Sequence, residues 1–434
     1  MSRSVRVPIS NQFADGGYSA HVHLGTHQQP ARLILDTGSS TLAVSVSHFH
    51  AQQDTSLSGT PYAQSLRYGK GGWYGAVVKS TVSLGLCGHR AVLNNALFAI
   101  VKEAEEGCFK QSDGIMGLAY QGLNHAHDMQ KSLQAESDVT STFPEIFELS
   151  PPAGSTVFNY ISQHPSLTLP AYFTELESQG VVADQFAFLV HRSSIYRPEK
   201  HHLRDTMASH WKNHGLFIIG KPWLHTDLFH EPVHTVKLVD DKYYNVELES
   251  VRVGESPEFT VPRLDTAQQK RWRSNAIVDT GSTVMIFPDP VYQFVVSEFK
   301  KQVTGASALL APFSAFSAEE KGVAMSELNV KEWPDIYLTF SGHNGEKDVL
   351  TLPAEAYWQE HAPATNLASF KLFTLPGWPP QSILGLPLIS CYYTLFDRQY
   401  TDKGCIHFAQ KARLSESLNT TLKQAFSAFH NEEK

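Results

Sequence analysis

Short apolar runs separated by turn-forming residues make up most of the chain. The runs are rich in Val, Ile, Thr and aromatic side chains, and Gly, Asn, Asp and Pro interrupt them, which is typical of β-strands joined by turns. This pattern predicts strands within residues 18–26, 31–40, 75–86, 96–101, 216–220, 243–254, 276–281, 335–340 and 391–397. The sequence therefore predicts a mainly β protein.

Helical periodicity is confined to a few segments. The candidate helices are residues 142–150, 171–180 and 289–303, and Gly180 gives the second of them a stop signal. In the tail, residues 411–434, apolar side chains recur at helical spacing and predict an amphipathic helix that packs on the body of the protein: Leu414, Leu418, Leu422, Phe426 and Phe429. Two polar stretches, 121–140 and 191–214, show neither pattern and are interpreted as surface insertions.

An internal repeat divides the chain into two similar halves. ARLILDTGSST (31–41) and SNAIVDTGSTV (274–284) align without gaps through Asp-Thr-Gly-Ser. Each is followed downstream by a second motif of two apolar residues and glycine, in SDGIMGLA (112–119) and QSILGLPL (381–388). The same ordered pair of motifs in both halves predicts that each half builds the same local structure.

The first motif of each half carries the candidate chemistry. An aspartate at the end of an apolar strand, here Asp36 and Asp279, is costly to bury unless its carboxylate is hydrogen-bonded. The same three residue types follow each aspartate: Thr37, Gly38 and Ser39, and then Thr280, Gly281 and Ser282. Glycine lets backbone N–H groups approach the carboxylate. The threonine hydroxyls can lock one loop to the other, and the serine hydroxyls can bond the outer carboxylate oxygens.

If a two-fold axis relates the halves, Asp36 and Asp279 face each other. Two carboxylates about 3 Å apart cannot both ionise easily, so they share one proton. Such a pair is suited to general acid–base catalysis.

These motifs resemble the pepsin-type aspartic proteases, over about residues 15–410. The segment YGKGGWYGAVVKSTVSLG (68–85) is similar to the family's flap hairpin, with Tyr68 at the flap-tyrosine position and Gly69 and Trp73 beside it. The resemblance implies a mainly β, bilobal fold whose two pseudo-two-fold-related lobes flank a cleft. It also implies that Asp36 and Asp279 hold a water that attacks a peptide carbonyl, with no covalent acyl-enzyme and no cofactor or metal.

The resemblance further implies the domain organisation and the substrates. We expect an N-terminal lobe (1–190) with Asp36 and the flap, a C-terminal lobe (191–410) with Asp279, and the helical tail (411–434). The expected activity is an aspartic endopeptidase that hydrolyses extended peptides or unfolded proteins, with an acidic optimum and a preference for apolar side chains. Inhibition by statine-type transition-state mimics and a monomeric state are expected as well.

Two residues depart from the family pattern. Ala43 stands where the family usually has a Trp that bonds the flap tyrosine, and Trp73 could replace it as the partner of Tyr68. Leu386 follows Ile-Leu-Gly where many relatives have Asp, so the strongly acidic optimum of the family is in doubt. These departures keep open an alternative function, a pepsin-fold binding or inhibitor protein with weak or no catalysis.

Composition excludes several classes of protein. The 434 residues carry a net charge of −8 without a long basic run, so nucleic acid is not an expected partner. No stretch of about 18 apolar residues predicts a membrane span. The 21 histidines include HVH (21–23) and HFH (48–50), but no convincing third ligand accompanies them, so no metal site is expected.

The cysteines and the N-terminus bear on the compartment. None of the four cysteines, Cys87, Cys108, Cys391 and Cys405, matches the family's disulfide positions, and we expect four thiols. No signal peptide or propeptide is visible after Met1, which predicts a cytoplasmic protein that is active as made. In this it resembles the prokaryotic, cytoplasmic pepsin homologues of the shewasin type.

Overall fold

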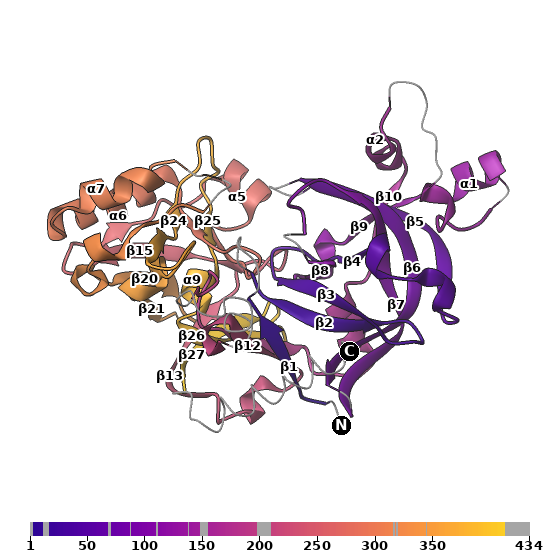
Figure 1. Cartoon of the computed structure of the whole chain (residues 1–434), viewed down its shortest axis with the longest axis horizontal. Coiled ribbons are helices and arrows are strands. Elements are labelled where there is room, and N and C mark those ends of the chain that lie inside the picture. The colour runs from indigo at the N-terminus through magenta and orange to yellow at the C-terminus, as the bar shows by residue number, and fades with distance from the viewer. Residues whose placement is uncertain are drawn as a thin grey trace. The chain divides into compact units, whose positions relative to one another are not determined.

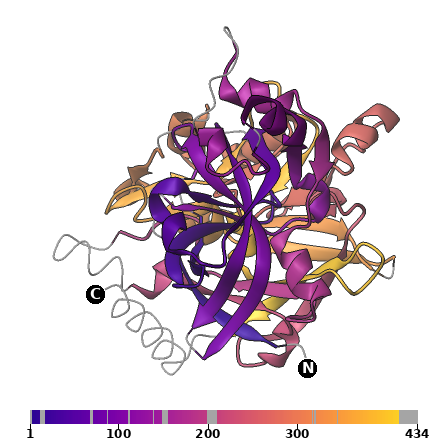
Figure 2. The same ribbon diagram turned by 90° about the vertical axis from the view of Figure 1, so that its right-hand side faces the viewer.

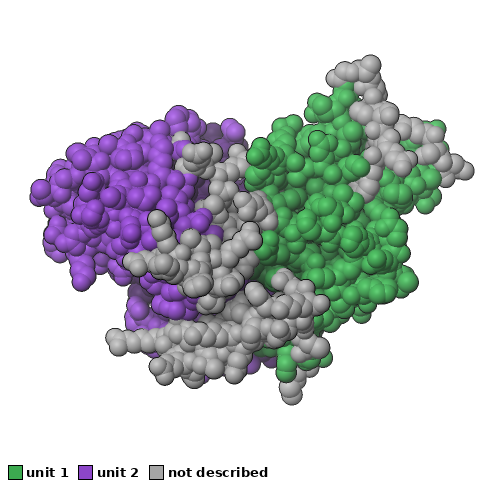
Figure 3. Space-filling view, viewed as in Figure 1, with its two compact units in different colours: residues 1–5, 19–183 green, residues 6–18, 184–434 purple. Residues whose placement is uncertain are grey.

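Strands dominate the described part of the chain, as the alternating pattern predicts. The computed structural model describes residues 3–11, 17–67, 71–86, 88–109, 112–137, 139–147, 155–197, 210–315, 317, 320–343 and 345–412. These form two compact units, coloured separately in Figure 3. Unit 1 comprises residues 1–5 and 19–183, and unit 2 comprises residues 6–18 and 184–434.

The division between the units differs from the expected boundary at 190/191. Strand β11 (Gln185–Leu189) pairs with β12 (His214–Ile219) and β26 (Tyr392–Asp397), so it belongs to unit 2. Residues 6–18 also belong there, because Asn11 donates its backbone N–H to the Asn213 carbonyl and the Tyr18 hydroxyl donates to the Arg192 carbonyl. The predicted tail helix lies outside the described residues.

Unit 1 is built on one sheet. Its strands are β2 (Ser19–Leu24), β3 (Gln29–Asp36), β4 (Leu42–Ser45), β5 (Ser58–Arg67), β6 (Gly72–Leu86), β7 (His89–Ala104), β8 (Gly114–Gly117), β9 (His125–Asp128) and β10 (Ser166–Thr168). Their order is β10-β9-β5-β6-β7-β4-β8-β3-β2, and a further pairing of β6 with β2 closes the sheet on itself. The strands β6 and β7 form a long twisted antiparallel ribbon (Figures 1 and 2). Helices α1 (Gln130–Ser137), α2 (Val157–Ser162) and α3 (Tyr172–Ser178) complete the unit.

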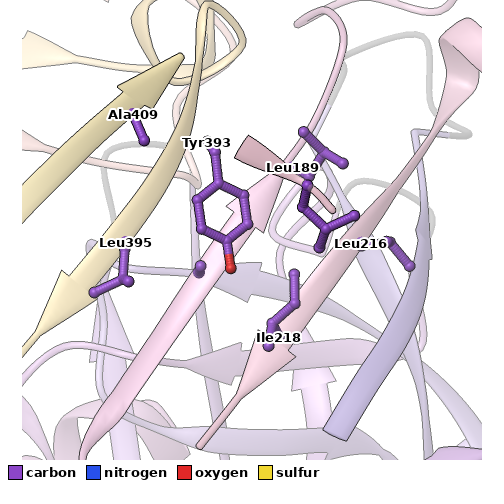
Figure 4. Packing of buried hydrophobic residues seen from close by; sticks show 8 residues of the cluster. Leu189, Leu216, Ile218, Tyr393, Leu395 and Ala409 are labelled. Atoms are coloured by element: carbon purple, nitrogen blue, oxygen red, sulfur yellow. The ribbon is translucent and has the colours of Figure 1, made fainter. Parts of the chain in front are cut away.

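Unit 2 contains several sheets. The first has the order β1-β12-β11-β26-β27-β13, with β1 (Val5–Ser10, all but its first residue in this unit), β13 (Phe229–Lys237) and β27 (Cys405–Lys411). Apolar side chains from β11, β12, β26 and β27 form a core cluster on this sheet, and Leu189, Leu216, Ile218, Tyr393, Leu395 and Ala409 are labelled in Figure 4. Because this cluster joins segments more than 200 residues apart in the chain, unit 2 depends on contacts that no local pattern reveals.

The remaining sheets of unit 2 are smaller. One has the order β14-β17-β25-β18-β24, with β14 (Asn245–Val246), β17 (Ala276–Val278), β25 (Ser382–Leu384), β18 (Met285–Ile286) and β24 (Leu372–Phe373). Another sheet has the order β16-β15-β20-β21, with β16 (Phe259–Thr260), β15 (Leu248–Val253), β20 (Ile336–Ser341) and β21 (Lys347–Leu352). The last has the order β19-β23-β22, with β19 (Val323–Ala324), β23 (Leu367–Phe370) and β22 (Trp358–Glu360). The helices are α5 (Thr266–Trp272), α6 (Asp289–Gln302), α7 (Ala306–Leu310), α8 (Ala354–Tyr357) and α9 (Leu386–Ile389).

Two of the three predicted helices are confirmed. The structure has α3 within 171–180 and α6 within 289–303, and α3 is followed by Gly180 with a φ of 68°. Residues 142–150 give only a 3₁₀ turn at Glu145–Phe147 before the described part ends. Glycine reaches positive φ at little steric cost, which is why it stops the helix where expected.

The interpretation of residues 121–140 as a surface insertion is wrong. They form β9, which pairs with both β5 and β10, and α1. Ala126, Met129 and Leu133 are at most 3% exposed. Because β9 is short and α1 presents only one side to the core, few apolar residues are enough to pack this segment on unit 1. The segment therefore shows little hydrophobic periodicity. Of the second polar stretch, residues 198–209 lie outside the described part.

The three cysteines that the structure describes, Cys108, Cys391 and Cys405, are thiols, and Cys87 lies outside the described residues. In the hairpin of β26 and β27, Cys405 pairs with Asp397. In this register Cys391 and Cys405 are not bridged, as expected. Among the described residues, no helix is long and apolar enough to cross a bilayer.

A buried ion pair connects two distant segments of unit 2. The Lys371 ammonium donates to Glu320, and the two side chains are only 5% and 17% exposed. The Ser194 hydroxyl also donates to Glu320, at 2.8 Å. Burial alone raises the pKa of Glu320, but the charge of Lys371 and the hydrogen bonds outweigh it, so the net pKa is lowered. The carboxylate is thus held in its ionised form.

Candidate active site

The first aspartate ends a buried strand and is held by its own loop. Asp36 is the last residue of β3 and is 8% exposed. One carboxylate oxygen accepts the Gly38 backbone N–H at 2.8 Å, and the other accepts the Ser39 hydroxyl at 2.5 Å. Both carboxylate oxygens therefore have donors, which offsets the cost of burial and fixes the orientation of the group.

The loop after Asp36 rests on the segment that follows β8. Leu118 donates its backbone N–H to the Asp36 carbonyl at 2.7 Å. The Ser40 hydroxyl donates to the Tyr120 carbonyl, and the Thr41 hydroxyl to the side-chain oxygen of Asn124. No motif in the sequence indicates the roles of Tyr120 and Asn124, because a backbone carbonyl and a single asparagine leave no pattern.

The second aspartate has a similar but not identical surrounding. Asp279 follows β17 and is half-buried, and one of its carboxylate oxygens accepts the Gly281 backbone N–H at 2.8 Å. The Ser282 hydroxyl donates to the Val284 carbonyl at 2.8 Å. A hydroxyl has one proton to donate, so Ser282 differs from the expectation that it donates to the carboxylate. Ser39 meets that expectation.

The strand pairing around the two aspartates repeats. In unit 1, β3 pairs in parallel with β8, β8 antiparallel with β4, and β4 in parallel with β7. In unit 2, β17 pairs in parallel with β25, β25 antiparallel with β18, and β18 in parallel with β24. The sequence repeat is thus a structural repeat of four strands with the aspartate at the same place in each.

The glycines of the second motif explain why that motif accompanies the first. A Cβ atom on Gly117 would come within 2.5 Å of the Ser40 and Thr41 backbone. A Cβ atom on Gly385 would clash with the Val284 carbonyl and come within 2.5 Å of the Ser282 carbonyl. In each unit the strand beside the aspartate loop can approach it only where the side chain is a hydrogen atom.

We expect Gly117→Ala and Gly385→Ala each to destabilise the protein by about 1–3 kcal/mol, because the added methyl group meets backbone that cannot move aside freely. Urea unfolding followed by fluorescence measures the loss. Gly122→Ala is the matched control, since a Cβ atom there meets nothing within 4 Å. Equal stabilities of all three variants would contradict this account of the motif.

The threonines of the two loops are both buried. Thr37 is 0% exposed and Thr280 is 1% exposed. Their proposed role in locking one loop to the other, and the facing of Asp36 and Asp279, concern the relation between the two units and remain predictions.

The predicted flap residues are placed only in part. Tyr68 and Gly69 lie outside the described residues, between β5 and β6, which pair as far as Arg67 and Gly72. Trp73 is 1% exposed and lies in a core cluster with Ala43 and Phe109, so its side chain offers substrate no surface. The large side chain of Trp73 thus packs in the same core cluster as the small side chain of Ala43. Its indole N–H is buried without a partner in the described part of the chain.

Each unit carries an Asp-Thr-Gly-Ser loop at the same place in the same pattern of four strands. This repeated arrangement is characteristic of an aspartyl protease. In agreement, the family described as "Eukaryotic aspartyl protease" matches residues 17–143 and 207–411, and the chain belongs to this family. The match includes residues 121–140, which supports their assignment to the fold. The mainly β, pepsin-like, two-unit fold expected from the sequence is confirmed.

Individual relatives are distant but extend over most of the chain. Pepsin A of Gallus gallus is 24% identical over 411 residues, which cover 92% of this chain and 85% of that protein. "Probable vacuolar protease A" of Trichophyton verrucosum is 23% identical over 419 residues, with 93% and 80% covered. Cathepsin D of Dictyostelium discoideum is 29% identical over 140 residues, with 29% and 35% covered.

No metal site was expected, and the described residues include no group of three or more His, Cys, Asp or Glu side chains that could hold a metal ion.

Proposed function

We propose that the protein is an aspartic endopeptidase whose catalytic residues are Asp36 and Asp279. The observation that carries the proposal is the repeated cradle: each carboxylate accepts the N–H of the glycine two residues later, at 2.8 Å in both units. Membership of the aspartyl protease family supports it. The same glycine contact orients a carboxylate in each unit, as a reaction that uses both carboxylates requires.

In the proposed mechanism the two carboxyl groups share one proton and bind a water. The ionised carboxylate takes a proton from the water as its oxygen attacks the peptide carbonyl carbon, and the protonated carboxyl gives its proton to the carbonyl oxygen. The gem-diol then collapses: the first carboxyl gives the proton that it took from the water to the leaving nitrogen as the amide C–N bond breaks. The other carboxylate takes a proton from one hydroxyl of the gem-diol, which becomes the product carboxylic acid. The intermediate is never covalently attached to the protein.

The proposed substrates are extended peptides and unfolded proteins with apolar side chains next to the cleaved bond. Membership of the aspartyl protease family supports peptides and proteins as the substrate class. The apolar residues that follow the Asp-Thr-Gly-Ser segment of unit 2 do not support this preference. Met285, Ile286 and Phe287 are at most 7% exposed and belong to the core. Leu386 is likewise buried, at the start of α9. An acidic pH optimum is part of the proposal, with Leu386 in place of the usual Asp as a reason to measure it.

The test is cleavage of an unfolded protein between about pH 3 and 6 with purified chain, with and without a statine-type transition-state mimic. We expect cleavage that the mimic abolishes. Cleavage that the mimic leaves intact, or no cleavage at any pH, would overturn the proposal, and the second result combined with binding of a protein partner would favour the non-catalytic alternative.

We expect Ser39→Ala to lower kcat/KM by roughly 10- to 100-fold, because a hydrogen bond to a charged group contributes about 1.5–3 kcal/mol. Ser282→Ala is the matched control, since that hydroxyl donates to a backbone carbonyl and not to the carboxylate. Kinetics on one peptide substrate measure both variants. An equal loss in the two would show that the asymmetry of the loops has no catalytic consequence.

We also propose that the chain belongs with the prokaryotic, cytoplasmic homologues of the shewasin type. The thiol state of Cys108, Cys391 and Cys405 supports a reducing compartment. Fractionation of the source cells tests this, and recovery of the protein from an extracellular or vacuolar fraction would refute it.

A further inference from the structure

Unit 2 contains a cavity that has no part in the chemistry proposed above. It has a volume of about 360 Å³ and lies where β21, α8, the end of α9 and the end of β27 meet the residues that follow β11. Its lining includes Lys411, His191, Glu355 and Cys391 and none of the residues of the two aspartate loops. The volume is at the lower end of the range of small-molecule sites, roughly 300–1,000 Å³.

A lysine in this cavity has a donor to spare. The Lys411 ammonium donates to the carbonyls of Val190, at 3.2 Å, and of Ser390. An ammonium has three N–H groups, so one remains for a ligand in the described structure. Burial lowers the pKa of Lys411, opposed by Cys391 and Glu355. The partners of this half-buried ammonium are carbonyls without net charge, so a carboxylate is the ligand that would stabilise its charge most.

A histidine next to the lysine has an unsatisfied nitrogen. The Nε2 atom of His191 is buried and has no hydrogen-bond partner in the described part of the chain. The ring lies edge to face on Trp211, with the centroids 4.9 Å apart. Burial, and then the charges of Lys411, His214 and Lys212, hold its pKa well below the usual value. The imidazole is therefore neutral near pH 7 and adds no charge to the cavity, which leaves Lys411 as the cation of its lining.

The cavity also contains a negative charge. Glu355 is exposed, in the first turn of α8. Within the described residues it forms no ion pair with Lys411 at 4.0 Å or less, although its charge acts on that lysine. The rest of the lining includes the apolar residues Pro353 and Ala356. One cation and one anion that do not neutralise each other directly are complementary to a molecule with both charges.

We propose that this cavity binds a small zwitterion of the amino acid type, a free α-amino acid or a dipeptide. Its carboxylate binds Lys411, its ammonium binds Glu355, and an apolar side chain contacts Pro353 and Ala356. The site belongs to unit 2 alone and does not depend on peptidase activity.

The experiment measures binding of four probes to the full chain by calorimetry: leucine, leucyl-leucine, N-acetylleucine without the ammonium, and leucinamide without the carboxylate. We expect N-acetylleucine and leucinamide to bind at least about tenfold more weakly than leucine or leucyl-leucine, whichever binds better, because each lacks one charged hydrogen bond. The difference between leucine and leucyl-leucine tells a free amino acid from a dipeptide.

Variants place the binding in the cavity, since probes could also enter the peptidase site. Glu355→Gln should weaken binding of leucine or leucyl-leucine about tenfold and leave the affinity for N-acetylleucine unchanged. Lys411→Gln should also weaken binding of leucine or leucyl-leucine about tenfold, but leave the affinity for leucinamide unchanged. Glu360→Gln is the control, because Glu360 is exposed and does not line the cavity. Circular dichroism checks that Lys411→Gln folds. If that variant does not fold, Glu355→Gln still tests the site. No binding of leucine or leucyl-leucine up to about 10 mM, equal affinity for all four probes, or an unchanged affinity in Glu355→Gln would overturn the proposal.

Discussion

Asp36→Asn and Asp279→Asn, made separately, are each expected to lower the rate of peptide cleavage by roughly 10²- to 10⁴-fold, the usual contribution of general acid–base catalysis. The amide cannot take the proton of the water or return one to the leaving nitrogen. It still accepts the glycine N–H that fixes the side chain, so the loop should keep its structure. Initial rates on a peptide substrate across the acidic range measure the loss.

The control for these variants is Asp402→Asn, at an exposed position in the turn between β26 and β27. It makes the same chemical change without touching either loop and should keep full activity. Retained cleavage in either the Asp36 or the Asp279 variant would show that the reaction does not need both carboxyl groups, and the mechanism proposed here would fail.

Lys371→Met is expected to destabilise unit 2 by about 3–5 kcal/mol, because it leaves the buried Glu320 carboxylate without its partner. Removing both charges together, by Lys371→Met with Glu320→Leu, should recover most of this loss. Urea unfolding at neutral pH measures both. Lys301→Met is the control, since Lys301 is 67% exposed in its pair with Glu298 and such a pair contributes about 1 kcal/mol or less.

The effect of Lys371→Met should depend on pH. The folded-state pKa of Glu320 is lowered, so its contribution to stability is present above the unfolded value of about 4.3 and is lost as pH falls through the folded value. The stability difference between the parent protein and Lys371→Met should therefore shrink as pH falls below about 4.3. A difference that stays constant from neutral to acidic pH would show that the pair does not act through its charges.

The parts of the fold and site that the sequence predicts correctly depend on short segments. The strands around Asp36 and Asp279 and the glycine cradles come from runs of fewer than a dozen residues, and their duplication separates them from chance. Gly117 and Gly385 belong to a visible motif, but the motif does not show that each lies against the backbone of an aspartate loop.

The features that were missed depend on partners far apart in the chain. Glu320 and Lys371 are 51 residues apart, and Lys411 bonds Val190 across 221 residues, so no periodic pattern brings them together. The position of Trp73 in the flap-like segment predicts a residue of the substrate-binding flap, and this role stays a prediction. The burial of Trp73 with Ala43 is decided by side-chain volume in the folded core, which a linear pattern does not contain.

The assignment of residues 6–18 to unit 2 has a consequence for the order of synthesis. β1 lies beside β12, and Ser10 contacts His214, 204 residues later. At about 5–20 residues per second, the ribosome needs roughly 10–40 s to produce that partner. Unit 1 is complete at residue 183, before β12 exists. The second strand next to β1 is therefore synthesised only after unit 1 is complete, so this edge of β1 is the last part of the N-terminal segment to be paired.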